Sequence, residues 1–167
     1  MEILIRPFEP SDMDRLYFLD QRCHEEGLRI TYSKWLSALL ERDVSVLVAV
    51  ESTGDRPEPL RACLLLQAES WRQQVKVLAL MVDPEVRRQG LASRLLDWAA
   101  RLGERLQMRE LSLLQESEDP ALLGLLNGRG FRRTDELALG LRSAEPRPVW
   151  SLALAGGVET AELPTEP

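Results

Sequence analysis

The chain has 167 residues, a length typical of one globular domain, and 44% of them are hydrophobic, enough for a single core. Its 21 Lys and Arg against 27 Asp and Glu give a formal net charge of −6, which argues against nucleic-acid binding through a broad basic surface. No apolar run approaches the roughly 18 residues that cross a bilayer, and the opening Met1, Glu2 and Ile3 do not resemble a signal peptide. We therefore expect a cytoplasmic protein with no membrane or nucleic-acid partner.

Two cysteines, Cys23 and Cys63, lie far apart in the sequence. In a chain without a secretory leader this spacing favours buried free thiols in a reducing compartment over a disulfide. No metal site is predicted.

The first half of the chain alternates strand and helix patterns. In chain order, the periodicity predicts a strand over residues 2–8, helices over 12–22 and 31–41, strands over 45–51 and 60–68 joined by a turn-rich hairpin at 52–59, and a strand over 75–82. Ser11 is the candidate N-cap of the first helix and Ser33 that of the second, because a Ser hydroxyl accepts hydrogen bonds from the free amides of a first turn. Gly27 is expected to end the first helix.

The second half continues with helices and strands. The sequence predicts a helix over residues 91–106, a strand over 110–115, a helix that begins at residue 120, and strands over 131–141 and 148–154. Asp119 is the candidate N-cap before Pro120, which suits a first helical turn, and Gly128 and Gly130 are expected to stop that helix. Residues 156–167 contain two glycines, two prolines, three glutamates and no basic residue, which predicts a disordered tail.

The stretch VDPEVRRQGLA at residues 82–92 joins a predicted strand directly to a predicted helix. The first amides of a helix have no partner inside it and carry about half a positive charge. Gly90 lets the backbone approach a ligand, and Arg87 and Arg88 add positive charge, so a phosphate or pyrophosphate is the natural ligand. The alternative is a tight turn with solvated arginines, and the Rossmann and Walker glycine patterns are absent.

This stretch resembles the acyl-CoA loop of the GNAT superfamily of acyl-CoA N-acyltransferases, which reads V-x-P-x-x-R-x-x-G-x-G/A. Residues 82–92 match every fixed position, with Ala92 for the second glycine. Residues 122–131 are similar to the later family motif A-x-x-L-Y-x-x-x-G-F and keep its Leu and its final Gly-Phe. The opening segments 5–7 and 11–14 are also similar to the first strand and helix cap of the family.

The resemblance covers residues 2–155, and the segment LDQRCHEEGL at 19–28 is similar to the branch that acetylates protein N-termini, such as ribosomal-protein alanine. It implies an α/β (α+β) GNAT fold, with a mixed, mostly antiparallel central sheet of about seven strands flanked by about four helices. A single acetyltransferase domain is expected over residues 1–155. The implied activity transfers an acetyl group from acetyl-CoA to a primary amine of a small molecule or protein, and a homodimer is left open.

In the family the strands before and after the helix that follows the loop splay apart, and the opened ladder exposes backbone groups to the pantetheine arm of coenzyme A. The residues implied to bind the cofactor are Leu80, Met81, Val82, Arg87, Arg88, Gln89, Gly90, Leu91, Ala92, Ser93, Asp119 and Leu126. The first two helices and the loop between them are implied to cover the acceptor, which makes His24, Glu25, Glu26, Arg29 and Tyr32 the candidate substrate residues. His24 is the only histidine, and we favour a surface histidine at a helix C-terminus over a general base.

The chain departs from the family where catalytic side chains are expected. Leu78 and Leu114 stand at the usual carboxylate positions, Leu126 at the tyrosine, and Asp119 at an asparagine that contacts coenzyme A. The catalytic residues are therefore unknown, and the candidates are Glu116, Glu118, Tyr32 and Asp135. Proximity alone contributes roughly 7–11 kcal/mol, more than acid–base catalysis, so we favour an enzyme. The alternatives are a non-catalytic acyl-CoA-binding sensor or interaction module, and a structural domain with a vestigial loop.

Overall fold

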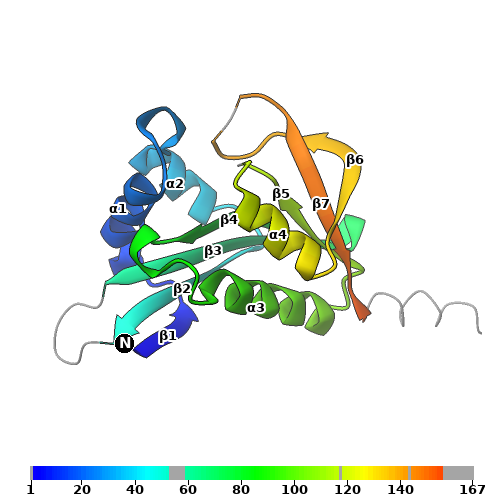
Figure 1. The fold of residues 1–167 in the computed structure, drawn as a ribbon, viewed down its shortest axis with the longest axis horizontal. Coiled ribbons are helices and arrows are strands. Elements are labelled where there is room, and N and C mark those ends of the chain that lie inside the picture. The colour runs from blue at the N-terminus through cyan, green and yellow to red at the C-terminus, as the bar shows by residue number, and fades with distance from the viewer. Residues whose placement is uncertain (1, 53–58, 117, 143, 156–167) are drawn as a thin grey trace, which may run out of the picture. The chain divides into compact units, whose positions relative to one another are not determined.

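A computed structural model describes residues 2–52, 59–116, 118–142 and 144–155 (Figure 1). The strands are β1 (Glu2–Pro7), β2 (Val44–Ser52), β3 (Leu60–Glu69), β4 (Gln74–Val82), β5 (Glu110–Leu114), β6 (Arg132–Ala138) and β7 (Arg147–Ala153). The α-helices are α1 (Met13–Cys23), α2 (Tyr32–Leu39), α3 (Leu91–Arg105) and α4 (Pro120–Gly128), and the 3₁₀ turns are η1 (Pro10–Asp12), η2 (Glu26–Leu28), η3 (Ser70–Arg72) and η4 (Pro84–Val86). None of the α-helices in the described part of the chain has the length and apolar character that a membrane span requires.

The strands form one seven-stranded sheet in the order β1-β2-β3-β4-β5-β7-β6. The pairs β1–β2, β5–β7 and β6–β7 are antiparallel and the pair β4–β5 is parallel, so the sheet is mixed and mostly antiparallel, as predicted. By their internal contacts the residues group into two units, Met1–Leu66 with Ala79–Leu95 (unit 1) and Gln67–Leu78 with Leu96–Pro167 (unit 2). Each unit is described below by itself.

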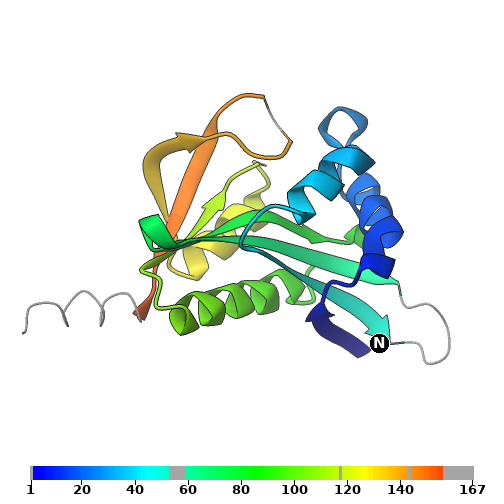
Figure 2. The same ribbon diagram turned by 180° about the vertical axis from the view of Figure 1, so that it is seen from behind.

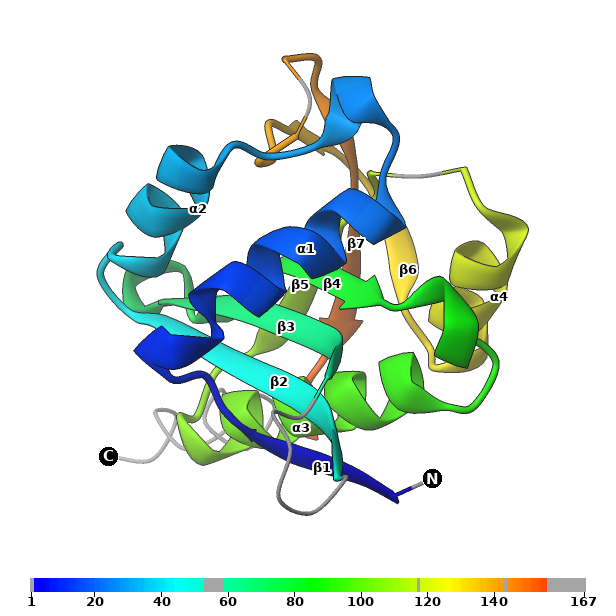
Figure 3. The ribbon, with the colours of Figure 1, turned by 90° about the vertical axis from the view of Figure 1, so that its left-hand side faces the viewer.

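Unit 1 is built on β1, β2 and most of β3. In β2 and β3 the buried residues are consecutive (Val48 to Val50 and Ala62 to Leu66), a pattern typical of strands that are covered on both faces. Helix α1 lies across β2 and β3 (Figure 3) and buries Met13, Leu16 and Leu19. Each such side chain contributes about 1.5–3 kcal/mol when it is fully buried, so packing on the sheet stabilises this short helix.

Unit 2 contains β5, β6, β7 and α4, with the start of β4 and most of α3. The parallel β4–β5 ladder joins Gln74–Val77 to Glu110–Leu113 and ends there, although β4 itself runs on to Val82. Strands β6 and β7 lie side by side (Figure 2), with an irregularity in register between Arg133 and Leu137. Helix α4 closes at its C-terminus on Gly130, whose φ of 88° lets Phe131 N donate to Leu126 O at 3.0 Å.

The predicted helix boundaries at Ser11, Ser33 and Gly27 are wrong, and the two N-terminal ones are described first. Ser11 is not the cap of α1, because it lies inside η1, where Asp12 accepts a hydrogen bond from Glu9 N at 2.8 Å and begins the helix instead. The cap of α2 is Thr31 and not Ser33, since the Thr31 hydroxyl accepts from Lys34 N at 3.2 Å. Local propensity could not separate these nearby residues, because Asp, Ser and Thr are all favoured at the N-cap.

Gly27 does not end α1, which stops four residues earlier at Cys23. His24 is already extended, with φ −136° and ψ 148°, and Gly27 lies in η2. The buried Asp20 carboxylate accepts a hydrogen bond from Ile30 N at 2.9 Å, so the chain must turn back before another helical turn forms.

The last two strands also differ from their predicted bounds. Strand β6 is shorter than the predicted 131–141, because Phe131 belongs to the closure of α4 and the pairing with β7 ends at Ala138. Strand β7 begins one residue early, at Arg147. The predicted hairpin tip at 53–58 and the tail at 156–167 lie outside the described residues.

Candidate active site

The loop between β4 and α3 is anchored by one buried carboxylate. Asp83, at the end of β4, accepts a hydrogen bond from Glu85 N at 2.9 Å and thereby caps η4. The same side chain is 3% exposed and accepts from Arg22 at 2.8 Å and from Arg61 at 3.0 Å. A buried carboxylate is stable in the charged form only when it is paired in this way, so the start of the loop is held rigidly against α1 and β3.

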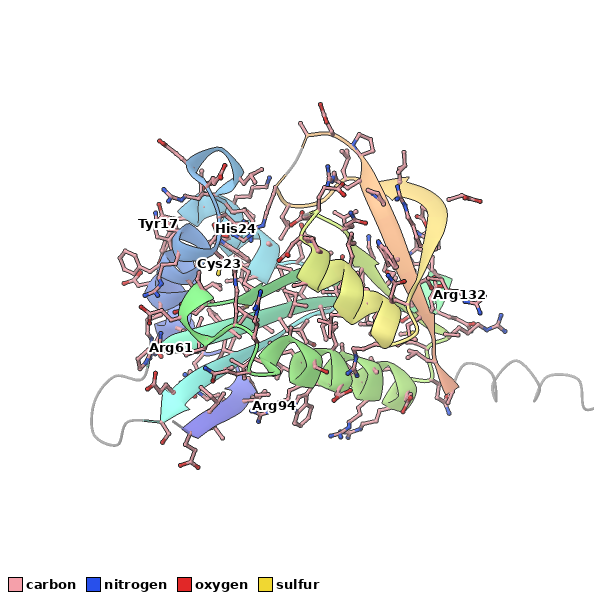
Figure 4. The ribbon with its side chains drawn as sticks, viewed as in Figure 1. Tyr17, Cys23, His24, Arg61, Arg94 and Arg132 are labelled. Atoms are coloured by element: carbon pink, nitrogen blue, oxygen red, sulfur yellow. The ribbon has the colours of Figure 1, made fainter. Side chains whose placement is uncertain are left out.

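Arg61 extends this anchor to β2. Its guanidinium donates to Glu51 at 2.8 and 2.9 Å and also reaches Asp83 and Glu85. The hydrogen bonds to Glu51 first, and then to Asp83 and Glu85, raise the pKa of Arg61 far above its ordinary value despite partial burial. Arg61 therefore stays charged at every pH of interest, and it binds three carboxylates from β2, the end of β4 and η4. Figure 4 shows it beside the turn that follows β4.

Two residues in the second half of the loop have a left-handed backbone conformation. Arg88 has a φ of 65° and Gly90 a φ of 80°, and backbone turns of this kind can direct successive amides toward an anion. Gly90 O accepts from Arg94 N at 3.0 Å, so Gly90 caps α3. The amides of Leu91 and Ala92 therefore belong to the first turn of this helix, where amides have no partner inside the helix. No heavy atom lies within 4 Å of the position where a Cβ would stand on Gly90. The loop conformation therefore leaves open the space in which the sequence analysis expects an anion.

The end of β4 carries the residues expected beside the pantetheine arm. Met81 is buried, Leu80 and Val82 are half-buried, and all three follow the point at which the β4–β5 ladder ends. Val82 O already accepts from Arg87 Nε at 3.2 Å and lies 3.4 Å from Cys23 Sγ, which donates to it. The carbonyl oxygen of Val82 therefore already accepts from two donors of the protein itself.

Cys23 is half-buried and its thiol is protonated. Burial raises the pKa of the Cys23 thiol, against the opposing effect of Arg87, so the sulfur acts as a donor to Val82 O. Both Cys23 and the fully buried Cys63 are free thiols, although only Cys63 is buried to the extent predicted for both.

The candidate substrate residues come together on the segment between α1 and α2. Glu25 and Glu26 are exposed, and the segment is closed by Leu28 N donating to Glu25 O at 2.9 Å. Arg29 Nε donates to His24 O at 3.0 Å, so its charge is tied to the backbone of the segment. His24 is one-fifth exposed, with its Nδ1 3.1 Å from an oxygen of Asp20.

Tyr32 lies at the first position of α2, and its hydroxyl donates to Asp14 at 3.2 Å. Desolvation, and then the hydrogen bond to Asp14, raise the pKa of the Tyr32 phenol, so the hydroxyl stays protonated at neutral pH and acts as a donor. The ring also contacts Tyr17, with centroids 5.6 Å apart. These contacts place Tyr32 on the α1 side of its helix.

The remaining candidates belong to unit 2 and are mostly engaged in local pairs. Glu116 is bound by the buried Arg142 at 3.2 Å, and the exposed Glu118 lies 3.4 Å from Arg147. Asp119 accepts from Ala121 N at 3.0 Å, which confirms it as the cap of α4. Leu126 is fully buried and Asp135 is exposed on β6.

Asp20 is the residue that the sequence analysis missed. It is fully buried on α1, four residues before His24 and ten before Ile30, and it contacts both. The signal was present, because an aspartate on the apolar face of an amphipathic helix requires a partner. His24 follows the last residue of α1, so the end of the helix brings its ring close to Asp20.

The strand order, the parallel β4–β5 pair and the glycine-bearing loop between β4 and α3 are the features expected of an acyl-CoA N-acyltransferase. A sequence profile of the Acetyltransferase (GNAT) family matches residues 4–131, and the chain belongs to this family. It is an N-acetyltransferase, and acetyl-CoA is its cosubstrate. When bound, acetyl-CoA supplies the acetyl group as a thioester.

Solved structures share the fold. Ard1 from Thermoplasma volcanium is 20% identical, with a TM-score of 0.75, and the match covers 92% of this chain and 99% of that one. The ribosomal-protein-S18-alanine N-acetyltransferase from Escherichia coli is 18% identical, with a TM-score of 0.73 and coverage of 92% and 94%. A phosphinothricin acetyltransferase from Sinorhizobium meliloti in complex with AcCoA is 15% identical, with a TM-score of 0.73 and coverage of 95% and 92%. No curated protein sequence matches the chain.

Proposed function

We propose that the protein transfers the acetyl group of acetyl-CoA to the α-amino group of a peptide or protein N-terminus. The main observation that supports this function is the attachment of α1 to the end of β4. Arg22 binds Asp83 and Cys23 binds Val82 O, so the segment that begins at His24 starts beside the proposed cofactor strand. The exposed Glu25 and Glu26 on this segment attract a terminal ammonium group.

The shared fold with an enzyme whose name specifies an alanine of a ribosomal protein, the ribosomal-protein-S18-alanine N-acetyltransferase, supports a protein acceptor. The competing acceptor is a free polyamine or an amine antibiotic, and the phosphinothricin acetyltransferase and the spermidine/spermine acetyltransferase SpeG from Vibrio cholerae share the same fold. The negative charge of Glu25 and Glu26 does not separate the two classes of acceptor, because both are cations.

Release of the free thiol from acetyl-CoA distinguishes these acceptors. The probes are a short peptide that begins with alanine and contains one lysine, the same peptide with its N-terminus blocked, and spermidine. We expect turnover of the free peptide and not of the blocked one, with the product acetylated at its N-terminus by mass spectrometry. Equal rates for the free and the blocked peptide, or turnover of spermidine alone, would refute the proposed acceptor.

We further propose that residues 1–155 act as one domain in a reducing, cytoplasmic environment, without nucleic-acid or membrane partners. Strands β3 and β4 and helix α3 each continue from one unit into the other, which supports a single folding unit. The free thiols of Cys23 and Cys63 and the net charge of −6 support the other two expectations. A single cooperative transition in thermal unfolding tests the domain assignment.

A further inference from the structure

The only histidine of the chain lies against a buried carboxylate. Asp20 is fully buried, and its Oδ2 accepts a hydrogen bond from Ile30 N at 2.9 Å. Its Oδ1 lies 3.1 Å from Nδ1 of His24, four residues later and just beyond the C-terminal end of α1. The imidazole is therefore held on one edge by a group whose own position is fixed by the backbone of the following segment.

The contacts of Nδ1 determine which ring nitrogen carries the hydrogen. Nδ1 also lies 3.2 Å from the carbonyl oxygen of Asp20. A carboxylate oxygen and a carbonyl oxygen only accept hydrogen bonds, so Nδ1 must be the donor and the neutral ring has its lone pair on Nε2. Within the described residues no side chain or backbone group binds Nε2.

His24 also stands at the end of the proposed cofactor strand. The two residues before it attach α1 to this strand: Arg22 binds Asp83 at 2.8 Å and Cys23 Sγ lies 3.4 Å from Val82 O. Cys23 and His24 lie together at the C-terminal end of α1 (Figure 4). Each charged group around this point is engaged in its own hydrogen bond; these groups are Asp20, Arg29, Asp83 and Arg87.

From this geometry we infer that His24 is the general base of the acetyl transfer and that Asp20 is its positioning residue. The inference rests on the proposed function, since it requires an amine that arrives protonated. It also accounts for the leucines at the usual positions of catalytic carboxylates, because a base supplied from α1 makes a carboxylate on β4 or β5 unnecessary. An acid that orients an imidazole through Nδ1 and leaves Nε2 open is a recurrent arrangement for proton removal.

The proton balance is complete without another reagent. Nε2 takes one proton from the ammonium group of the acceptor, and the freed nitrogen bonds the carbonyl carbon of the thioester as the carbon–sulfur bond breaks. The electron pair of that bond leaves on sulfur, and the second proton lost by the nitrogen neutralises the thiolate. The products are the amide, the thiol of coenzyme A and a protonated imidazole, which solvent then deprotonates.

The decisive variant is His24→Asn. The amide nitrogen of asparagine can replace Nδ1 as the donor to Asp20, but asparagine offers no base in place of Nε2. We expect kcat with the alanine peptide to fall about 10²- to 10⁴-fold, with KM for the peptide and the dissociation constant of acetyl-CoA little changed. Added imidazole should restore part of the rate to His24→Gly.

Hydroxylamine serves as the matched acceptor, because it is already largely unprotonated near neutral pH and needs no base. His24→Asn should acetylate hydroxylamine at nearly the wild-type rate, whereas damage to the fold or to cofactor binding would lower both rates together. If the wild-type protein acetylates spermidine and not the peptide, the proposed acceptor fails and the same comparison with spermidine still tests the base. Equal losses with both amines, or a kcat for His24→Asn within about threefold of the wild type, would overturn the assignment.

A second readout does not depend on turnover. Because the chain has one histidine, the ¹⁵N spectrum of its imidazole is unambiguous. The hydrogen should reside on Nδ1 in the neutral ring of the wild type, and the fraction on Nε2 should rise in Asp20→Ala, which loses the carboxylate acceptor but keeps the carbonyl of residue 20. A wild-type ring that carries its hydrogen on Nε2 would exclude the general base, whatever the kinetics show.

Discussion

Replacing Gly90 by alanine tests the conformation on which the proposed anion site depends. The added methyl group meets no atom within 4 Å, so the change introduces no clash inside the protein. Its cost comes from the φ of 80°, which is unfavourable for an L-residue by about 1–2 kcal/mol. The lower entropy of the unfolded alanine chain offsets roughly 0.4–1 kcal/mol, which leaves a net loss of about 1 kcal/mol. For a chain of this size that lowers the unfolding midpoint by about 2–4 °C.

Thermal unfolding with and without acetyl-CoA measures both consequences of Gly90→Ala. Saturation at a hundred times the dissociation constant adds about 2.7 kcal/mol to the wild type, and the methyl group should reduce this gain because it projects into the open space over the loop. Gly124→Ala is the matched control, since Gly124 also faces open space but lies inside α4, where alanine stabilises by about 1 kcal/mol. The two variants should therefore shift the midpoint in opposite directions. A Gly90→Ala protein as stable as the wild type and with an undiminished acetyl-CoA shift would refute both the left-handed loop and its role in binding.

Three further predictions concern the interior. Gly103→Ala should not stabilise α3 as Gly124→Ala stabilises α4, because its Cβ would stand 2.5 Å from Leu154 Cδ1 and overpacking costs about 1–3 kcal/mol; urea midpoints of the two variants compare them directly. Asp12→Asn should lose about 3–5 kcal/mol in urea unfolding, since the fully buried carboxylate binds Arg6 and Arg15 at 2.7 Å, and a loss below 1 kcal/mol would contradict this. Burial would raise the pKa of Asp12, but the hydrogen bonds from Arg6 and Glu9 N and the arginine charges outweigh it and lower the pKa. This contribution is therefore present above the unfolded-state pKa and is lost as the pH falls through the folded one, so wild-type stability should fall more steeply in acid than that of Asp12→Asn. Gln115→Leu should cost about 1–3 kcal/mol, because Trp150 Nε1 donates to Gln115 at 2.7 Å in the interior; unchanged stability would mean that the indole finds another acceptor.

Most of the fold followed from local sequence signals. Seven strands and four helices were predicted near their observed positions, because alternating and helical apolar periods reflect which face of an element is buried. Asp119 and Gly130 marked the two ends of α4 correctly, since capping and left-handed closure depend on residues within one turn. Ser11, Ser33 and Gly27 failed for the complementary reason: a competing contact, through Asp12, Thr31 or Asp20, decided each boundary.

The sequence by itself determined the family, the helices and strands, and the glycine-bearing loop between β4 and α3, because the residues responsible are neighbours in the chain. The tertiary structure alone decided which charged groups meet. Asp83 is 61 residues from Arg22 and 22 from Arg61, yet both arginines bind its buried carboxylate. In the sequence, Asp20 is only an aspartate on the apolar face of a predicted helix. The tertiary structure shows its partners, since its carboxylate accepts from Ile30 N and lies against His24. Apolar burial is encoded by a repeating period, whereas the partner of a buried charge is selected by where the packed elements bring opposite charges together.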